Sequence, residues 1–275
     1  MTQDTGKFRK NTKDQYYTKA SIAAACVTTI RRLCPEAEEY QWVEPSAGKG
    51  AFIKALNGIT DILGMDLEPG DSSILGGDFL KWQPATQKKR IFFGNPPFGP
   101  QSSLAKAFIR HAAQQGDIIA FILPRSFVKP SMNRVFPLAF HCEYSQELDK
   151  GAFEVNGFEY DVPCVFQIWR KKTTNRVIEP PIDPVGFVYV KHGSAYDLAI
   201  KRAGGCAGKC SVGGDPNPNY HYFLKLETKY LVNLSAIIEK LDQHTFPSNT
   251  VGPRSLSKSE VSHVLNRILV DYTIC

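Results

Sequence analysis

The sequence has no apolar run long enough to cross a membrane, and its first thirty residues lack the apolar core of a secretory signal peptide. It also lacks a regular cysteine pattern, because its seven cysteines are odd in number and irregularly spaced. Such usage argues against a disulfide framework and favours a reducing compartment. We therefore expect an intracellular protein of the cytoplasm or nucleus with no membrane partner.

A strong charge of either sign is missing as well. The formal net charge is +6 over 275 residues, which permits a polyanionic partner without requiring one. The basic excess lies at the two ends of the chain, in 1–19 and 171–275. An apolar fraction of 43% with 11% aromatic residues supports a packed core. The length allows one large domain, or one domain with a smaller module.

One stretch of the chain joins an apolar strand to a rigid polar corner. The apolar run Ile91–Phe93 stops at Gly94-Asn95-Pro96-Pro97-Phe98-Gly99. Proline has no N–H and a fixed φ, so the carbonyls of Asn95 and Pro96 point away from a sheet ladder. The amide oxygen and the fixed carbonyl are two acceptors, and Phe98 adds a flat apolar face. This set suits a planar ligand with an exocyclic amino group, although a turn that only closes a core strand is the structural alternative.

The pattern around this corner alternates between strand and helix. Periodicity predicts helices over 20–33, 51–56 and 104–115, and strands over 41–43, 62–65, 91–93 and 117–123. This alternation predicts a parallel, doubly wound sheet. An Asn-Gly turn at 156–157 predicts a hairpin over 152–160, and 162–169 reads as a further strand.

Two further features lie at predicted strand ends. The segment Glu44-Pro45-Ser46-Ala47-Gly48-Lys49-Gly50 stands between a strand and a helix, where glycine lets the backbone approach a ligand. Asp66 ends the second strand, at the position where Rossmann-like sheets hold a ribose diol. A tight turn without a ligand would also explain the Gly-x-Gly pair by itself.

The Asn95–Phe98 motif resembles the Asn-Pro-Pro-Phe/Tyr motif of S-adenosylmethionine-dependent amino-methyltransferases, above all the N6-adenine enzymes. The linear order resembles the gamma type of these enzymes: cofactor segment, catalytic loop, target recognition. Similar layouts occur in proteins of phages and large DNA viruses. The resemblance covers about 14–170. It implies an α/β class I methyltransferase fold, with a Rossmann-like doubly wound sheet and an antiparallel end hairpin, followed by a small C-terminal α+β module.

The resemblance also implies roles for the matched residues. Asn95 and the Pro96 carbonyl would accept hydrogen bonds from the target amine, Pro97 completes the catalytic motif, and Phe98 would stack on the extruded base. Asp66 would bind the ribose of S-adenosyl-L-methionine. The full implied cofactor set is Tyr17, Thr18, Glu44, Pro45, Ser46, Ala47, Gly48, Gly50, Asp66, Leu67, Asp78, Phe79 and Asn95. Relatives carry a different residue at the position of Lys49, which we expect to face solvent.

The implied reaction is methyl transfer to the N6 amine of adenine in nucleic acid. DNA is favoured over RNA because the segment order matches the DNA enzymes. RNA N6-adenosine methylation is the main alternative, since the same motif serves RNA enzymes. Methylation of a protein glutamine amide, and a non-catalytic nucleic-acid-binding subunit, are further alternatives. Arg125 and Lys129, after the fifth strand, lie on the expected ligand side and could meet phosphates; a solvated loop explains them equally.

We expect a flexible basic tail over 1–13, a catalytic domain over 14–172 and, after a proline-rich linker, a target-recognition module over 183–275. In the module we predict a helical turn or two over 195–202, a strand over 220–224 and a helix opened by the capping box Ser257–Glu260. The aromatic residues of that strand could stack on bases or simply form core. Cys206 and Cys210 lack the spacing and fourth ligand of a zinc site, so we expect no metal. The oligomeric state stays open.

Overall fold

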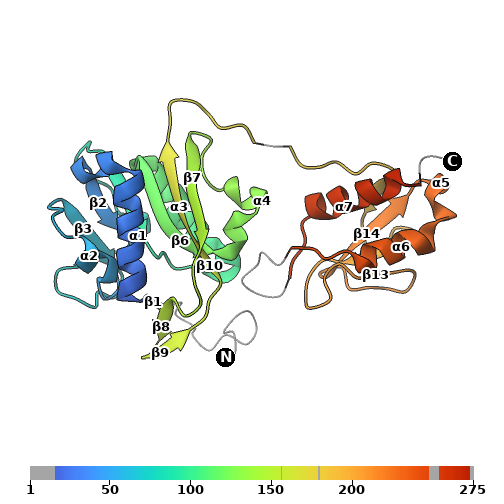
Figure 1. Cartoon of the computed structure of the whole chain (residues 1–275), viewed down its shortest axis with the longest axis horizontal. Coiled ribbons are helices and arrows are strands. Elements are labelled where there is room, and N and C mark those ends of the chain that lie inside the picture. The colour runs from blue at the N-terminus through green and yellow to red at the C-terminus, as the bar shows by residue number, and fades with distance from the viewer. Residues whose placement is uncertain (1–15, 156, 179, 248–253, 273–275) are drawn as a thin grey trace. The chain divides into compact units, whose positions relative to one another are not determined.

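The computed structural model describes residues 16–155, 157–178, 180–247 and 254–272, so the predicted tail 1–13 lies outside the described residues. The chain forms two compact units, 1–178 and 179–275 (Figure 1). Each unit has its own main sheet and its own buried core.

A seven-stranded sheet is the centre of the first unit. In sheet order it contains β4 (Leu75–Gly76), β3 (Ile62–Asp66), β2 (Gln41–Glu44), β5 (Arg90–Gly94), β6 (Ile118–Pro124), β10 (Cys164–Lys171) and β7 (Phe140–Glu147). The strands from β4 to β6 are parallel, and β10 runs antiparallel to both of its neighbours. The unit therefore has the Rossmann-like, doubly wound architecture that the sequence predicts.

Helices cover both faces of this sheet. Side chains alternate between the two faces along each strand. On one face Phe93 meets Phe52 of α2 (Ala51–Ala55), with 6.1 Å between ring centres, and α2 lies beside α1 (Ala20–Leu33). On the other face Phe92 belongs to the core cluster that contains Phe108 of α3 (Ser103–Gln115). Strands β5 and β6 are buried along their whole length, which explains the continuous apolar runs Ile91–Phe93 and Ile118–Leu123 within them.

The remaining elements of the first unit are short. They are η2 (Pro35–Glu39), η3 (Phe79–Lys81), η4 (Pro100–Ser102), η5 (Arg125–Val128) and α4 (Pro130–Asn133). Strand β7 was not predicted from the sequence, because it is mostly exposed and reads Phe-His-Cys-Glu-Tyr-Ser-Gln-Glu without apolar alternation. Its strand conformation depends on pairing with β10.

A small second sheet stands apart from the main one in the first unit. It consists of β1 (Tyr17–Thr18), β8 (Phe153–Val155) and β9 (Phe158–Tyr160), all antiparallel. The hairpin predicted over 152–160 is confirmed as β8 and β9, with Asn156 outside the described residues. The pairing of β8 with β1 joins the start of the described chain to a segment far along the sequence, Tyr17 with Glu154 and Thr18 with Phe153.

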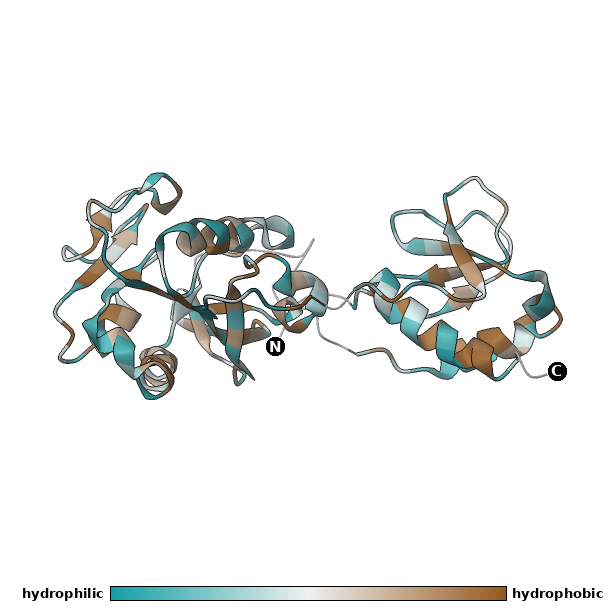
Figure 2. Cartoon of the chain, turned by 90° about the horizontal axis from the view of Figure 1, so that it is seen from above, coloured by the Kyte–Doolittle hydropathy of each residue, from teal (hydrophilic) through white to brown (hydrophobic). Residues whose placement is uncertain are grey.

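The second unit is a four-stranded antiparallel sheet with helices. Its strand order is β11 (Phe187–Val190), β14 (His221–Leu226), β12 (Leu198–Lys201) and β13 (Cys210–Ser211), and its helices are α5 (Thr228–Leu231), α6 (Leu234–Gln243) and α7 (Lys258–Val270). The capping box that starts α7 is confirmed, since Ser257 and Glu260 bond each other's backbone N–H. In Figure 2 the helices carry both hydrophobic and hydrophilic residues, as helices packed on a sheet do.

The predicted helical turn over 195–202 is wrong, because this segment contains the strand β12. Leu198 and Ile200 join the core of the unit, whereas Ala199 between them points to the other face. The strand is held on both sides by β14 and β13. Tertiary pairing thus outweighs the helical preference of a short segment that contains two alanines and a leucine.

Candidate active site

The carboxyl ends of three neighbouring strands bring the predicted site residues together. Glu44 ends β2, Asp66 ends β3 and Gly94 ends β5, and β2 pairs with both other strands. Asn95 follows Gly94 directly. In open α/β sheets ligands bind outside this edge, so the sheet topology places these residues where a ligand is expected.

The glycine loop after β2 links Asp66 to Asn95. The Ser46 hydroxyl donates to the Asn95 carbonyl at 3.1 Å, and the Gly48 N–H donates to Asp66 Oδ2 at 2.7 Å. Gly48 and Gly50 have φ values of +53° and +75°, in the left-handed region that favours glycine. The loop is therefore held on both sides, and its glycines are required by the backbone conformation.

Asp66 and Asp78 both use their carboxylates to order the nearby backbone. Asp66 Oδ1 accepts from the Glu68 N–H at 2.9 Å, and Asp78 Oδ1 accepts from the Leu80 N–H at 3.0 Å. Each carboxylate oxygen has two lone pairs, so both groups retain the capacity to accept from hydroxyl or amine donors. Leu67, beside Asp66, is 75% exposed and offers an apolar surface at the same edge.

The side-chain amide of Asn95 has one satisfied end and one unsatisfied end. Its Nδ2 donates to the Tyr16 carbonyl at 3.2 Å. A carbonyl can only accept, so this contact fixes which end of the amide is the oxygen. Within the part of the chain that the structure describes, the buried Oδ1 has no hydrogen-bond partner. Buried polar atoms are normally paired, so this oxygen retains the capacity to accept a hydrogen bond from a ligand.

The segment after Asn95 is stiff and locally strained. Pro96 is buried, Pro97 and Phe98 are half-buried, and Phe98 packs against the edge of the core. Two residues a little further on, Gln101 and Ser102, have φ values of +51° and +59° although neither is glycine. Each such residue costs roughly 1–3 kcal/mol, and strain of this kind gathers where a loop clamps a ligand.

Glu44 is a buried carboxyl at the centre of this edge. It is 2% exposed, and its Oε2 has no hydrogen-bond partner within the described residues. Burial raises the pKa of Glu44 well above its ordinary value, a hydrogen bond from the Ile53 backbone lowers it, and the charge of Asp66 raises it again. A cation brought to the site would restore the charged form of this carboxyl.

Tyr17 forms a wall on the other side of the glycine loop. Strand β1 pairs Tyr17 with Glu154 and Thr18 with Phe153. A Cβ atom added to Gly48 would lie 3.2 Å from the Tyr17 ring. The exposed Lys49 places its Nζ 4.5 Å from the centre of the same ring. The structure thus brings Tyr17 to the glycine loop, whereas Thr18 is placed only by its pairing in β1.

Phe79 is less accessible than a ligand-stacking residue would be. Its ring is 2% exposed and lies among Phe92, Phe108 and His111, whose ring centres are 5.5, 5.1 and 4.8 Å away. Phe79 therefore forms the floor below Asp78. Its predicted contact with a cofactor ring is limited to the little surface that stays exposed.

The two predicted phosphate contacts lie at the same edge, after β6. Arg125 Nη2 pairs with Glu147 at 2.8 Å, and Arg125 Nε is buried without a hydrogen-bond partner within the described residues. Lys129 is only 8% exposed. A phosphate contact by either residue stays a prediction, and for Arg125 it would compete with the Glu147 ion pair.

Two site features were not predicted from the sequence. One is the Tyr16 carbonyl, which orients the Asn95 amide; no local signal exists, because the contact depends on β1 pairing with β8. The other is Gly94, whose φ is +117° and where an added Cβ would lie 3.0 Å from Glu44 Cγ. A glycine directly before the Asn-Pro-Pro corner was a usable signal for this close approach.

The described residues contain no group of three or more His, Cys, Asp or Glu side chains that could hold a metal ion. Cys206 is exposed, and burial raises the pKa of Cys210 to about 12. Among the helices of the described ranges, none is long and apolar enough to cross a membrane.

Comparison with known proteins yields similarity in structure only. No protein-family model and no curated protein matches the sequence. A candidate RNA methyltransferase from Pyrococcus horikoshii is 16% identical, over 59% of this chain and 91% of that one, with a TM-score of 0.46. A candidate class I S-adenosylmethionine-dependent methyltransferase from Listeria monocytogenes is 14% identical, over 63% and 65%, with a TM-score of 0.47. A 16S rRNA methyltransferase in complex with S-adenosyl-L-homocysteine is 12% identical, over 55% and 64%, with a TM-score of 0.36.

Proposed function

We propose that this protein transfers a methyl group from S-adenosyl-L-methionine to the N6 amine of adenine in nucleic acid. The observation that carries the proposal is Asn95 Oδ1, a buried acceptor with no partner among the described residues, beside the glycine loop. An exocyclic amine is the donor that this acceptor and the neighbouring Pro96 carbonyl would take. The segment order keeps DNA as the preferred polymer.

The donor set at the strand ends fits the cofactor. S-adenosyl-L-methionine carries a carboxylate, an ammonium, a ribose diol and an adenine amine. The N-terminal segment with Thr18 would hold the carboxylate, the unpartnered Oε2 of Glu44 would complement the ammonium, Asp66 would accept from the diol, and Asp78 would accept from the adenine amine. When bound, the cofactor supplies a methyl group made electrophilic by its sulfonium.

The protein acts on the amine mainly by position and electrostatics. The N6 lone pair of adenine is delocalised into the ring and is a poor nucleophile. Two hydrogen bonds from the N6 protons, to Asn95 Oδ1 and the Pro96 carbonyl, favour a more tetrahedral nitrogen whose lone pair points away from the ring plane. Positioning and preorganised acceptors of this kind contribute several kcal/mol, to order of magnitude. The methylated nitrogen is acidic, so its proton needs no dedicated base.

A base inside a duplex must leave the stack to reach Asn95. Extrusion costs a few kcal/mol, roughly, and stacking on Phe98 offsets part of that cost. A base in a single strand avoids most of the cost. We therefore expect single-stranded substrates to be methylated faster than duplexes of the same sequence.

Nucleoside mass spectrometry tests the proposal. The wild-type protein and the Asn95→Ala variant are incubated with cofactor and with matched DNA and RNA oligonucleotides, and the digested nucleosides are measured. We expect N6-methylated adenine nucleoside with the wild type alone. Oligonucleotides in which purine replaces adenine lack the amine and serve as the substrate control. Methyl label found only on a protein glutamine amide, or on no substrate, would contradict the proposal.

Cofactor binding is measured separately by calorimetry. We expect binding by both proteins, because Asn95 acts on the target amine. Failure of the wild type to bind S-adenosyl-L-methionine would favour the non-catalytic nucleic-acid-binding subunit instead.

A further inference from the structure

The second unit contains a pocket that the proposed reaction does not use. We propose that this pocket binds an unpaired nucleotide, with a base against its rings and a phosphate at its cations. The proposal deepens the proposed function by assigning an unpaired strand as the substrate, and it rests on that function for the identity of the polymer. The pocket lies wholly within 189–258, so the inference concerns this unit alone.

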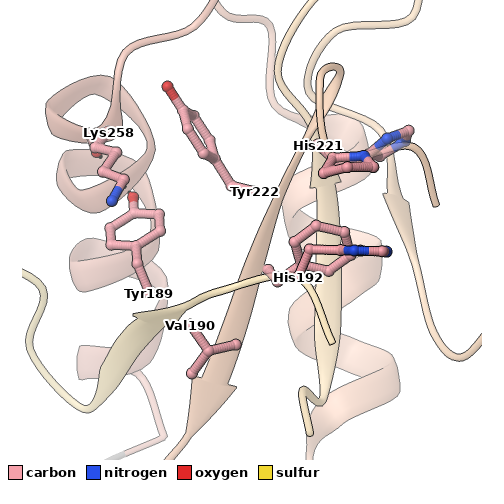
Figure 3. Close-up of a pocket in the computed structure, with 8 residues that line it drawn as sticks. Tyr189, Val190, His192, His221, Tyr222 and Lys258 are labelled. Carbon is pink, nitrogen blue, oxygen red and sulfur yellow. Dashed lines mark hydrogen bonds between the residues drawn. The ribbon is translucent and has the colours of Figure 1, made fainter. Parts of the chain in front are cut away.

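The pocket forms where two paired strands separate. The last register pair between β11 and β14 is Val190 with Phe223, yet β14 begins two residues earlier, at His221. His221 and Tyr222 therefore extend past the end of β11 and leave that side of β14 open. A pocket of about 160 Å³ lies there. Aromatic and basic side chains line it: Tyr189, His192, His221, Tyr222 and Lys258 (Figure 3), together with Phe223.

The walls of the pocket are rings held in fixed positions. The Tyr189 hydroxyl donates to the Lys258 carbonyl at 2.9 Å, and the Tyr222 hydroxyl donates to the Leu256 carbonyl at 3.0 Å. The two ring centres are 5.6 Å apart. Burial raises the pKa of Tyr189 to about 12, so its hydroxyl stays neutral. Such fixed rings favour stacking, because little side-chain freedom is lost when a base binds.

Two imidazole rings complete the lining. Figure 3 shows His192 and His221 near each other, across the view from Tyr189 and Lys258. The His192 ring lies 5.4 Å from the Phe223 ring, and its Nε2 is 2.6 Å from Asp215 Oδ1. His221 bonds the Asn217 carbonyl through Nδ1, at 2.9 Å. His221 is half-buried, so part of its ring is open to a ligand.

Three cations lie in or beside the pocket, namely the lining Lys258 and the neighbouring Lys201 and Arg202, against one carboxylate, Asp215, which pairs with His192. Lys258 Nζ lies 4.7 Å from the centre of the Tyr189 ring, and the Arg202 guanidinium lies 5.4 Å from that of Tyr222. Lys201 stands opposite His221 in the β12–β14 register. None of these three cations has an ion pair within the described residues, and no acidic side chain lines the pocket. Flat rings with unpaired cations complement a base and its phosphate.

The test uses the full-length protein and an oligonucleotide without adenine. Fluorescence anisotropy measures binding of labelled oligodeoxythymidine, without cofactor, by the wild type and the variants His221→Ala and Lys258→Ala. The matched control is Lys240→Ala, whose lysine also lies over a tyrosine ring, at 4.9 Å, but pairs with Asp271 outside the pocket. Thermal unfolding of each variant confirms that the fold is kept.

We expect His221→Ala to weaken binding about tenfold, the scale of one stacked base. We plot the logarithm of the binding constant against the logarithm of the salt concentration. We expect Lys258→Ala to reduce the magnitude of this slope by about 0.7, the value for one phosphate of a single strand. Lys240→Ala should bind like the wild type, and unlabelled duplex should compete poorly. Equal affinity of all four proteins, or equal competition by duplex, would overturn the proposal.

The two proposals fail separately. Oligodeoxythymidine has no N6 amine, so its binding is independent of methyl transfer. If the pocket variants lose this binding while no adenine is methylated, the pocket stands and the proposed function falls. If adenine is methylated while the pocket variants bind like the wild type, the reverse holds.

Discussion

The amide Nδ2 of Asn95 donates to the backbone carbonyl of Tyr16 at 3.2 Å, across 79 residues of sequence. This contact turns Oδ1 into the free end of the amide, where it is buried without a partner among the described residues. Orientation of the acceptor thus depends on the N-terminal segment, which β8 holds in place.

Removing the Asp66 carboxylate should weaken cofactor binding. Asp66→Ala removes both the proposed diol acceptor and the partner of the Gly48 N–H at 2.7 Å. We expect an affinity loss of tenfold or more, since hydrogen bonds to charged groups contribute about 1.5–3 kcal/mol each. Asp66→Asn keeps one acceptor oxygen and should lose less. Calorimetry with S-adenosyl-L-methionine gives both values, and unchanged affinity in Asp66→Ala would refute the assignment.

The buried Glu44 should make stability depend on pH. Burial raises the pKa of Glu44 in the folded protein well above the ordinary 4.5. As pH rises, the unfolded chain therefore loses the Glu44 proton at a lower pH than the folded protein does. The protonated carboxyl is stabilising below the unfolded value, and that contribution is lost as pH rises through the folded pKa. Glu44→Gln cannot titrate. The thermal midpoint of Glu44→Gln minus that of the wild type should therefore be larger at pH 8 than at pH 5. The same difference at both pH values would contradict this prediction.

A side chain at position 94 should destabilise the protein more than one at an uncrowded glycine. Gly94→Ala places a Cβ 3.0 Å from Glu44 Cγ at a φ of +117°. The control is Gly58→Ala in the same unit, with a φ of +83° and its nearest contact at 4.0 Å. Both substitutions place alanine at a positive φ, which lowers the free energy of unfolding by about 1–2 kcal/mol. Gly94→Ala should lose roughly 1 kcal/mol more in denaturant unfolding and most of its turnover, because Glu44 and Asn95 must shift. Equal losses of unfolding free energy in Gly94→Ala and Gly58→Ala would show that the Glu44 side chain moves aside at little cost, and would contradict this prediction.

Arg125 should contact a phosphate only if its ion pair with Glu147 breaks. Arg125→Ala should lower the salt slope for single-stranded DNA by about 0.7 if the contact forms. Glu147→Ala frees the guanidinium from its 2.8 Å ion pair and should strengthen binding. The anisotropy assay measures both variants. Unchanged binding of single-stranded DNA by both variants would show that Arg125 contacts no phosphate and has a structural role only.

Much of the first unit was predictable because its signals are local. Continuous apolar runs marked β5 and β6, and the glycine loop was marked by its own composition. The strands β7 and β12 were not found, since each owes its conformation to partners far along the chain. The same holds for Tyr16, whose carbonyl matters only after β1 pairs with β8. Pairing between segments far apart in the sequence leaves no local pattern, so these features could not be predicted.

The most direct test compares the wild type with Asn95→Ala in one experiment. Cofactor affinity is measured by calorimetry, and methyl transfer to a single-stranded, adenine-containing oligonucleotide is measured with labelled S-adenosyl-L-methionine. The account predicts that Asn95→Ala binds cofactor nearly as well as the wild type and transfers no detectable methyl group to adenine. Methyl transfer by the variant at a rate close to that of the wild type, or a collapse of cofactor affinity, would contradict the role of the Asn95 oxygen.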